Sequence, residues 1–373
     1  MKRILYLFVF VMFLSCGGND DTPDPIPEET TIKWNDAANS SSNALIASFW
    51  NTGEKYFNYD SNGKKDFHYW PQAHALDVMV DAYVRTGDNT YKNYFDQWFD
   101  GVKIKNGNTF QNEYYDDMEW IALAILRVYK ATNDNKYKEA ALQIWEYIKV
   151  GWNNNAGGGV TWKKGMEYSK NACSNGPACI LAARLYQEFG DEANKDWALK
   201  IYNWEKNTLF NSNNGMVYDN INSETGVIQK DWIFTYNQGT FIGSAVELYK
   251  ILGERSYLND AVLAADYTTS SLVSNSVLKS EGTGDGGLFK GIFIRYFTDL
   301  IQQDRLDNSA RNRYVQFIKF NAETLWNSGA TKSSYFFGPD WRTSPGSSTG
   351  LTEQLSGCML IEAAALLDNK KML

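Results

Sequence analysis

Two adjacent carboxylates, Asp116 and Asp117, are the residues of this sequence best suited to do chemistry. They stand between aromatic side chains in residues 114–120, at the head of an apolar helix that the residue spacing predicts over residues 117–131. Two acids in that position lie beside a core rather than out in water. Such a pair can cleave a glycosidic bond, because one carboxylate can stay ionised as a nucleophile while its neighbour holds a proton as the acid.

The same two residues also admit a purely structural interpretation. Aspartate is a favoured helix N-cap, and Asp116 followed three residues later by Glu119 has the spacing of a capping box, worth about 0.5 to 2 kcal/mol. A cap explains one carboxylate. It does not explain Asp117, because two anions at one helix end repel each other and must be solvated or used.

The N-terminal residues 1–15 are predicted to be a secretory signal peptide. Lys2 and Arg3 are followed by an apolar run over residues 4–14, which is too short to span about 30 Å of hydrocarbon at 1.5 Å per residue. Residues 13–17 resemble a bacterial lipoprotein box, in which Cys16 carries the lipid; an ordinary signal peptide with an incidental cysteine is the alternative. Residues 16–31 are acidic and rich in proline, which predicts a disordered tether behind this anchor.

Composition narrows the function of the remaining residues 32–373, which we expect to form a single domain. A net charge of −8 argues against nucleic acid as a partner, since phosphates call for clustered Lys and Arg. With only two histidines, the sequence does not favour a Ser-His-Asp triad or a histidine metal centre, and we expect neither a metal nor a cofactor. Three cysteines, Cys173, Cys179 and Cys358, lack metal-site spacing and are predicted to be buried thiols.

Helical periodicity predicts twelve helices of two alternating kinds. The first, third and later odd ones are amphipathic, whereas the even ones are apolar on most faces and rich in small residues, as in residues 180–183 and 241–245. The predicted helices cover residues 36–50, 72–86, 91–104, 117–131, 136–152, 175–189, 194–209, 238–252, 256–273, 288–302, 309–326 and 352–367.

A recurring helical hairpin predicts an all-α fold, an (α/α)6 barrel with two concentric rings of helices. Short turns such as Gly87-Asp88 and Gly190-Asp191 follow several even helices. An open solenoid is the structural alternative. In the barrel, the long loops over residues 51–71, 107–116, 153–174, 211–237, 274–287 and 327–350 all lie at the N-terminal ends of the inner helices, together with the aspartate pair.

Four stretches resemble glycoside hydrolase family 76, which comprises bacterial endo-α-1,6-mannanases and fungal cell-wall relatives. They are residues 75–83 (ALDVMVDAY), 115–120 (YDDMEW), 235–239 (TYNQG) and 289–295 (FKGIFIR). The resemblance implies an (α/α)6 barrel and hydrolysis with retention of configuration, with Asp116 as the nucleophile and Asp117 as the general acid/base. It also implies an α-mannan substrate. The acidic start after Cys16 resembles the export signal of surface lipoproteins in the Bacteroidetes, which implies a lipid-anchored protein on the outer-membrane surface.

Further candidates for sugar contacts come from the same stretches. They are Trp70, Asp77, Tyr115, Trp120, Tyr236, Asn237, Gln238 and Arg295. Asn237 could equally cap a helix, Asp77 could equally form a structural ion pair with Arg295, and Trp120 fits a core position. Trp162 and Trp232 are possible stacking surfaces for sugar rings.

Three functions remain open from the sequence. The first is endo-hydrolysis of an α-1,6-mannan backbone by a monomeric surface lipoprotein that touches the membrane only through its lipid. The second is a transglycosylase, which would use the same carboxylates and differ only in its products. The third is a surface protein that binds glycans without cleaving them, for which two vicinal acids have no purpose.

Overall fold

The computed structural model describes residues 31–373, and Lys33–Leu373 form one compact unit. The predicted signal peptide, the lipid attachment at Cys16 and all but the last residue of the tether lie outside the described residues and stay predictions. Among the described helices, none combines the length and the apolar character needed to cross a membrane.

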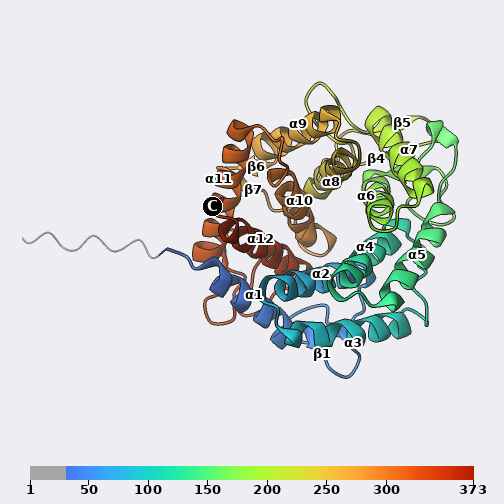
Figure 1. Cartoon of the computed structure of the whole chain (residues 1–373). Helices are drawn as coiled ribbons and strands as arrows, with labels where there is room; N and C mark the ends of the chain where they lie inside the picture. The colour runs from blue at the N-terminus through green and yellow to red at the C-terminus, as the bar shows by residue number, and fades with distance from the viewer. Residues whose placement is uncertain (1–30) are drawn as a thin grey trace, which may run out of the picture. The chain divides into compact units, whose positions relative to one another are not determined.

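Residues 31–373 contain twelve α-helices arranged in two concentric rings (Figure 1). Each inner helix contacts the next one in the order α2, α4, α6, α8, α10, α12, and α12 contacts α2, so the ring is closed. The (α/α)6 barrel is therefore confirmed and the open solenoid is excluded. The inner helices are α2 (Tyr69–Thr86), α4 (Tyr115–Thr132), α6 (Ala172–Phe189), α8 (Thr235–Leu252), α10 (Asp285–Ile301) and α12 (Leu351–Asn369). The outer helices are α1 (Trp34–Phe49), α3 (Asn89–Lys105), α5 (Asn135–Lys149), α7 (Glu192–Thr208), α9 (Arg255–Ser271) and α11 (Asn308–Thr324).

Small residues on the inner helices allow neighbouring backbones to approach closely. Gly239 of α8 faces α10 so tightly that a Cβ added there would lie 2.6 Å from the Cα atom of Phe293. A methyl group cannot be accommodated against a backbone atom at that distance. The small-residue pattern of the even helices thus reflects their place in the inner ring.

The short turns from inner to outer helices are those predicted from the Gly-Asp pairs that follow the even helices. Gly87 ends α2 in the left-handed region, at φ 69°, where glycine pays no steric cost. Asp88 then caps α3, and its carboxylate accepts a hydrogen bond of 2.8 Å from the backbone N–H of Thr90. Asn133-Asp134 and Gly190-Asp191 repeat this arrangement.

The inner helices begin earlier than their hydrophobic pattern predicted, because their first turns carry polar residues that bind the preceding loops. In four of them the fourth residue is an amide that pairs with loop backbone. Gln238 of α8 accepts from the N–H of Val217 at 3.0 Å and donates to its carbonyl at 2.8 Å. Gln72 of α2 and Asn175 of α6 make matching pairs. Gln354 of α12 accepts from the N–H of Phe337 and donates to the carbonyl of Tyr335.

The N-terminal ends of the inner helices, with the loops before them, form what we call the rim. These loops hold the short strands of the described chain, and β3, β4 and β5 make an antiparallel sheet in that order. The strands are β1 (Trp50–Asn51), β2 (Tyr56–Phe57), β3 (Ser169–Asn171), β4 (Asn220–Asn222), β5 (Val227–Gln229), β6 (Val273–Ser274) and β7 (Val277–Leu278). β4 and β5 form a hairpin within the loop over residues 211–237.

Candidate active site

Asp116 and Asp117 are the second and third residues of α4, on the rim, and both are partly exposed. The N-cap of α4 is Tyr114, which makes no capping hydrogen bond through its side chain. Glu119 is fully buried, and neither of its carboxylate oxygens has a hydrogen-bond partner among the described residues. The capping-box interpretation of Asp116 and Glu119 is therefore wrong, because neither residue caps the helix.

The loop before α6 holds the start of α4 in place. The backbone N–H of Tyr115 donates to the carbonyl of Trp162 at 2.9 Å. The Tyr114 and Trp162 rings lie 5.0 Å apart, and the Lys163 ammonium donates to the Tyr114 hydroxyl at 3.0 Å. These contacts place Trp162 beside the aspartate pair, where the sequence predicted a possible stacking surface.

Asp116 receives a hydrogen bond from a buried thiol. Cys173 Sγ, at the start of α6, lies 3.4 Å from Asp116 Oδ2. Asp116 Oδ1 is buried and has no partner among the described residues. Burial raises the pKa of Asp116, and hydrogen bonding from the Cys173 thiol and the Trp162 side chain lowers that pKa in part. Burial also keeps the pKa of Cys173 well above its usual range, so this residue stays a thiol that can donate.

Asp117 is surrounded by other acids. Burial raises the pKa of Asp117 well above its usual range, and the nearby charges of Asp116, Asp285 and Glu113 raise it further. Asp285, the first residue of α10, accepts hydrogen bonds from Trp70 Nε1 at 2.9 Å and from His68 Nε2 at 3.1 Å. The hydrogen bond from His68, followed by that from Trp70, keeps the pKa of Asp285 low, so Asp285 remains a carboxylate facing Asp117.

The two aspartates therefore differ in proton affinity. Asp116 is supplied with donors, whereas Asp117 faces three negative charges, so a proton shared by the pair resides on Asp117. The N-terminus of α4 adds a partial positive charge that favours one anion at this point. One ionised and one protonated carboxyl side by side can serve as a nucleophile and an acid.

Two further predicted site residues lie near Asp116 at the start of α8. The Tyr236 hydroxyl contacts the Cys173 thiol, and its ring stacks on Phe289 at 3.9 Å. Asn237 is buried, and its amide donates to Asp219 Oδ1 at 2.9 Å, while its own carbonyl oxygen has no partner among the described residues. Tyr236 is partly exposed on the rim, so of these two it is the one that a ligand can reach.

Three other predicted sugar contacts lie in the packed interior. Tyr115 and Trp120 are buried, and the Trp120 ring lies 4.9 Å from the ring of His74. Gln238 is fully buried, with both ends of its amide bound to Val217. The structure thus gives Gln238 a structural role, and it gives Trp120 the core position that the sequence also allowed.

Asp77 and Arg295 are not brought to the rim with the aspartate pair. Asp77 lies eight residues after the start of α2, about 12 Å along the helix at 1.5 Å per residue. It binds Arg127 at 2.6 Å, and Arg295 Nε lies 3.8 Å from its second oxygen. The ion pair between Asp77 and Arg295, which the sequence left open, is thus present within a larger network that also holds Asp81.

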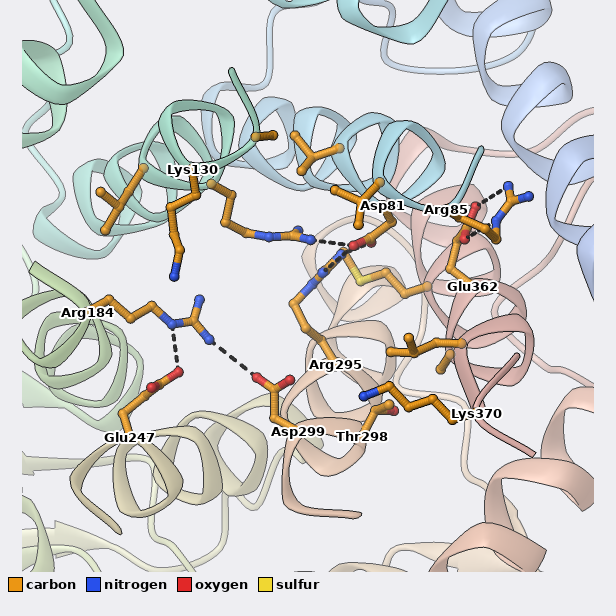
Figure 2. A pocket seen from close by; sticks show the side chains of 18 of the residues that line it. Asp81, Arg85, Lys130, Arg184, Glu247, Arg295, Thr298, Asp299, Glu362 and Lys370 are labelled. Carbon is orange, nitrogen blue, oxygen red and sulfur yellow. Dashed lines mark hydrogen bonds and ion pairs between the residues drawn. The ribbon is translucent and has the colours of Figure 1, made fainter. Parts of the chain in front are cut away.

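A cavity lies at the far end of the barrel from the aspartate pair, among the C-terminal halves of the inner helices. Its volume is ≈ 660 Å³. Figure 2 shows that arginines of this cavity bind acids: Arg184 lies between Glu247 and Asp299, and Arg85 binds Glu362. Because these arginines are paired with acids, we assign the charged residues of this cavity a structural role rather than a catalytic one.

A smaller cavity of ≈ 290 Å³ opens on the rim. It is lined by Tyr59 and His68 before α2, by Thr283 and Gly284 before α10, and by residues 348–353 at the start of α12. Since His68 binds Asp285, this cavity adjoins the acids around Asp117. Across residues 31–373, no group of three or more His, Cys, Asp or Glu side chains is arranged to hold a metal ion.

Sequence reasoning missed the contacts of Cys173, His68 and Asp285 with this site. Cys173, Cys179 and Cys358 are free and buried, as predicted, but the pattern gave no sign that Cys173 touches Asp116. Asp285 could have been recognised from the sequence as a candidate site residue, since it is an acid at the start of an inner helix, as Asp116 is. The burial of Glu119 and Glu205 was not predicted either, because it follows from the way the helices pack.

Comparison with known proteins adds three findings. A family model described as glycosyl hydrolase family 76 matches residues 33–373. The solved GH76A α-1,6-mannanase from Salegentibacter sp. HEL1_6 is 45% identical, with a TM-score of 0.87, over 90% of this chain and 99% of that chain. A variant of that mannanase with two consecutive aspartates replaced by alanine is described as inactive and was solved in complex with α-1,6-mannotetrose; it is 44% identical, with a TM-score of 0.88, over 90% of this chain and 100% of that one.

Among curated relatives, the mannan endo-1,6-alpha-mannosidase DCW1 of Saccharomyces cerevisiae is 25% identical over 224 residues. The match covers 54% of this chain and 49% of that protein. The chain thus spans about half the length of the curated relatives that it matches.

Proposed function

Because the chain belongs to glycoside hydrolase family 76, we propose that it is a retaining endo-hydrolase of an α-1,6-linked mannan backbone. Asp116 is the nucleophile and Asp117 the general acid and base. The observation that carries this assignment is the unequal environment of the two carboxyls, with a thiol donor at Asp116 and three carboxylates around Asp117. The likeness to a solved α-1,6-mannanase supports the substrate.

In the first step, the ionised carboxylate of Asp116 attacks the anomeric carbon of a mannosyl unit. Asp117 donates its proton to the glycosidic oxygen, so the bond to the leaving chain breaks while the bond to Asp116 forms. The hydrogen bond from Cys173 stabilises the carboxylate before the attack. Burial, then the charges of Asp116 and Asp285, raise the pKa of Asp117 and so favour its protonated form, which the first step requires.

In the second step, water replaces the leaving chain. Asp117, now ionised, takes a proton from the water, and the resulting hydroxide attacks the anomeric carbon and releases Asp116. Two inversions at one carbon give net retention of configuration. Because the first step removes the proton from Asp117, the same residue can serve as the base in the second step without any other group.

The placement of the protein in the cell is part of the same proposal and rests on the sequence alone. The signal over residues 1–15 exports the chain, lipid on Cys16 anchors it, and residues 16–31 hold the catalytic domain away from the membrane. The domain then acts as a monomer on polysaccharide at the outer-membrane surface. Cys16→Ala is expected to move the protein from the membrane fraction to the soluble fraction, and an unchanged distribution would contradict the anchor.

The direct test of the function compares linear α-1,6-mannan with an α-1,4-linked control polymer. Wild type is expected to release short oligosaccharides from the α-1,6 polymer only, and proton NMR should detect the α anomer first. Asp116→Asn and Asp117→Asn should each lower the rate by a factor of 100 or more, since acid–base catalysis alone contributes about 10²–10⁴.

The other outcomes separate the alternative functions. Binding of the polymer without any cleavage by wild type would make this a glycan-binding protein. Longer products that grow with acceptor concentration would indicate a transglycosylase. The β anomer appearing first would overturn the double-displacement mechanism while leaving hydrolysis intact.

A further inference from the structure

Trp232 is the only exposed tryptophan among the 13 in the chain. Its side chain is 54% exposed, whereas the other twelve, which all lie within residues 31–373, are buried or partly buried. Leaving a large aromatic ring in water forgoes the free energy that its burial would supply. An exposed tryptophan on a functional rim is therefore a candidate ligand contact.

Trp232 lies on the rim, in the segment between β5, which ends at Gln229, and α8, which begins at Thr235. The end of this segment is extended, with Phe234 at φ −113° and ψ 147°. Trp232 is two residues before Phe234, so their Cα atoms lie at most roughly 7 Å apart at about 3.3 Å per residue.

A continuous row of rings leads from Phe234 back to the aspartate pair. The Phe234 ring lies 5.4 Å from Phe289, and Phe289 stacks on Tyr236 with ring planes only 5° apart. The Tyr236 hydroxyl contacts the Cys173 thiol, which donates to Asp116. Phe234, Tyr236 and Phe289 are all partly exposed, so this row forms one side of the rim beside the site.

We propose that Trp232 is an outer sugar-binding residue, which stacks on a mannosyl unit remote from the bond that is cut. The inference rests on the proposed function, since its ligand is the same linear α-1,6-mannan chain. The carbon-bound hydrogens of a pyranose face are apolar, so an indole ring can cover them while the sugar hydroxyls stay in water. Trp232 lies beyond the inner rings of the row, so only a chain several units long reaches both Asp116 and Trp232.

The consequence is a preference for long chains. Short α-1,6-mannooligosaccharides that fill the site around the aspartate pair do not reach Trp232, whereas long oligosaccharides and the polymer do. Stacking on one aromatic ring changes affinity by about 2- to 10-fold. Trp232 therefore raises the ratio of kcat/KM for long substrates to kcat/KM for short ones.

The test measures this ratio in the full chain for wild type, Trp232→Ala, Trp232→Phe and Phe320→Ala. Linear α-1,6-mannan and a series of α-1,6-mannooligosaccharides of increasing length are the substrates. We expect Trp232→Ala to lower the long-to-short ratio by about 2- to 10-fold, mainly through a higher KM, and Trp232→Phe to restore most of it. Phe320, 46% exposed on the outer helix α11, is the matched control, and its removal should leave the ratio at the wild-type value.

Two failures are distinguishable. If wild type cleaves α-1,6-mannan and Trp232→Ala keeps the wild-type ratio at every chain length, the sugar-binding role of Trp232 is overturned and the proposed function stands. If wild type neither cleaves nor binds α-1,6-mannan, the proposed function fails, and the sugar-binding role of Trp232 fails with it. Circular dichroism of each variant confirms that a lowered ratio does not come from misfolding.

Discussion

Cys173 Sγ lies 3.4 Å from Asp116 Oδ2 and joins the start of α6 to the start of α4. A thiol is a weak donor, but this one is buried beside a carboxylate whose other oxygen has no partner among the described residues. In such surroundings even one hydrogen bond shifts the balance between the ionised and the protonated carboxyl. The contact between Cys173 and Asp116 therefore offers a direct way to test how the proposed nucleophile is kept ionised.

Removing the thiol should move the acid limb of the pH–rate profile. The thiol stabilises the ionised form of Asp116 and lowers its pKa, so Cys173→Ala should raise that pKa and shift the acid limb of kcat/KM to higher pH. The shift should reach about one pH unit at most, since a hydrogen bond is worth about 0.5–1.5 kcal/mol and one unit corresponds to about 1.36 kcal/mol. Cys173→Ser, which keeps a donor, and Cys179→Ala, which alters a thiol bonded elsewhere, serve as controls. An acid limb that does not move in Cys173→Ala would contradict the role of the thiol.

Asp285 should control the basic limb of the pH–rate profile. Its carboxylate raises the pKa of Asp117, so Asp285→Asn should lower that pKa, and the basic limb of kcat/KM should move to lower pH. Trp70→Phe removes one of the donors that hold Asp285 and should change the same limb. Asp196→Asn, on the exposed face of α7, is the control for loss of a distant charge. If the basic limb stays in place in Asp285→Asn, Asp285 does not raise the pKa of Asp117.

Two buried glutamates should make the fold less stable as pH rises. Glu119 and Glu205 are fully buried, none of their carboxylate oxygens has a partner among the described residues, and burial raises the pKa of both well above 4.5. The folded state then keeps protons that the unfolded state loses above pH 4.5. Stability contributed by these protons is complete below that pH and falls by up to about 1.4 kcal/mol per pH unit for each group, until the folded pKa is reached.

Glu205→Gln measures this effect, because the amide carries no charge at any pH. Its melting temperature should rise relative to wild type as the pH increases from 5 to 8, whereas Glu146→Gln, on an exposed side chain, should follow wild type throughout. Parallel curves for Glu205→Gln and wild type would show that Glu205 is not protonated in the folded state.

Gln238 should act on stability rather than on substrate affinity. Gln238→Leu leaves the backbone N–H and carbonyl of Val217 buried without partners, each at a cost of about 1–3 kcal/mol, so the free energy of unfolding should fall by about 2–6 kcal/mol. Gln143→Leu, on the exposed face of α5, should change it by less than about 0.5 kcal/mol. Unchanged unfolding together with a tenfold higher KM would instead return Gln238 to the sugar contacts predicted from the sequence.

Local signals in the sequence determined the elements of this protein. The number of helices, their two kinds and their turns could be predicted, because apolar periodicity, left-handed glycines such as Gly87 and aspartate caps such as Asp88 act within a few residues. The aspartate pair could also be found, since it stands between aromatic residues at the end of the barrel that carries the long loops, within a stretch that resembles glycoside hydrolase family 76. The early starts of the inner helices were missed, because their first turns are stabilised by loops rather than by their own periodicity.

Only the tertiary structure decided which side chains meet. Contacts such as Cys173 with Asp116 and Asp77 with Arg127 join residues 57 and 50 positions apart. They depend on the rotation of each helix about its axis and on the closure of the ring between α12 and α2, which no local pattern encodes. For that reason the sequence could name Asp116 and Asp117, whereas the tertiary structure brings Cys173 of α6 to Asp116 and the charge of Asp285 of α10 near Asp117, and so makes the two carboxyls unequal.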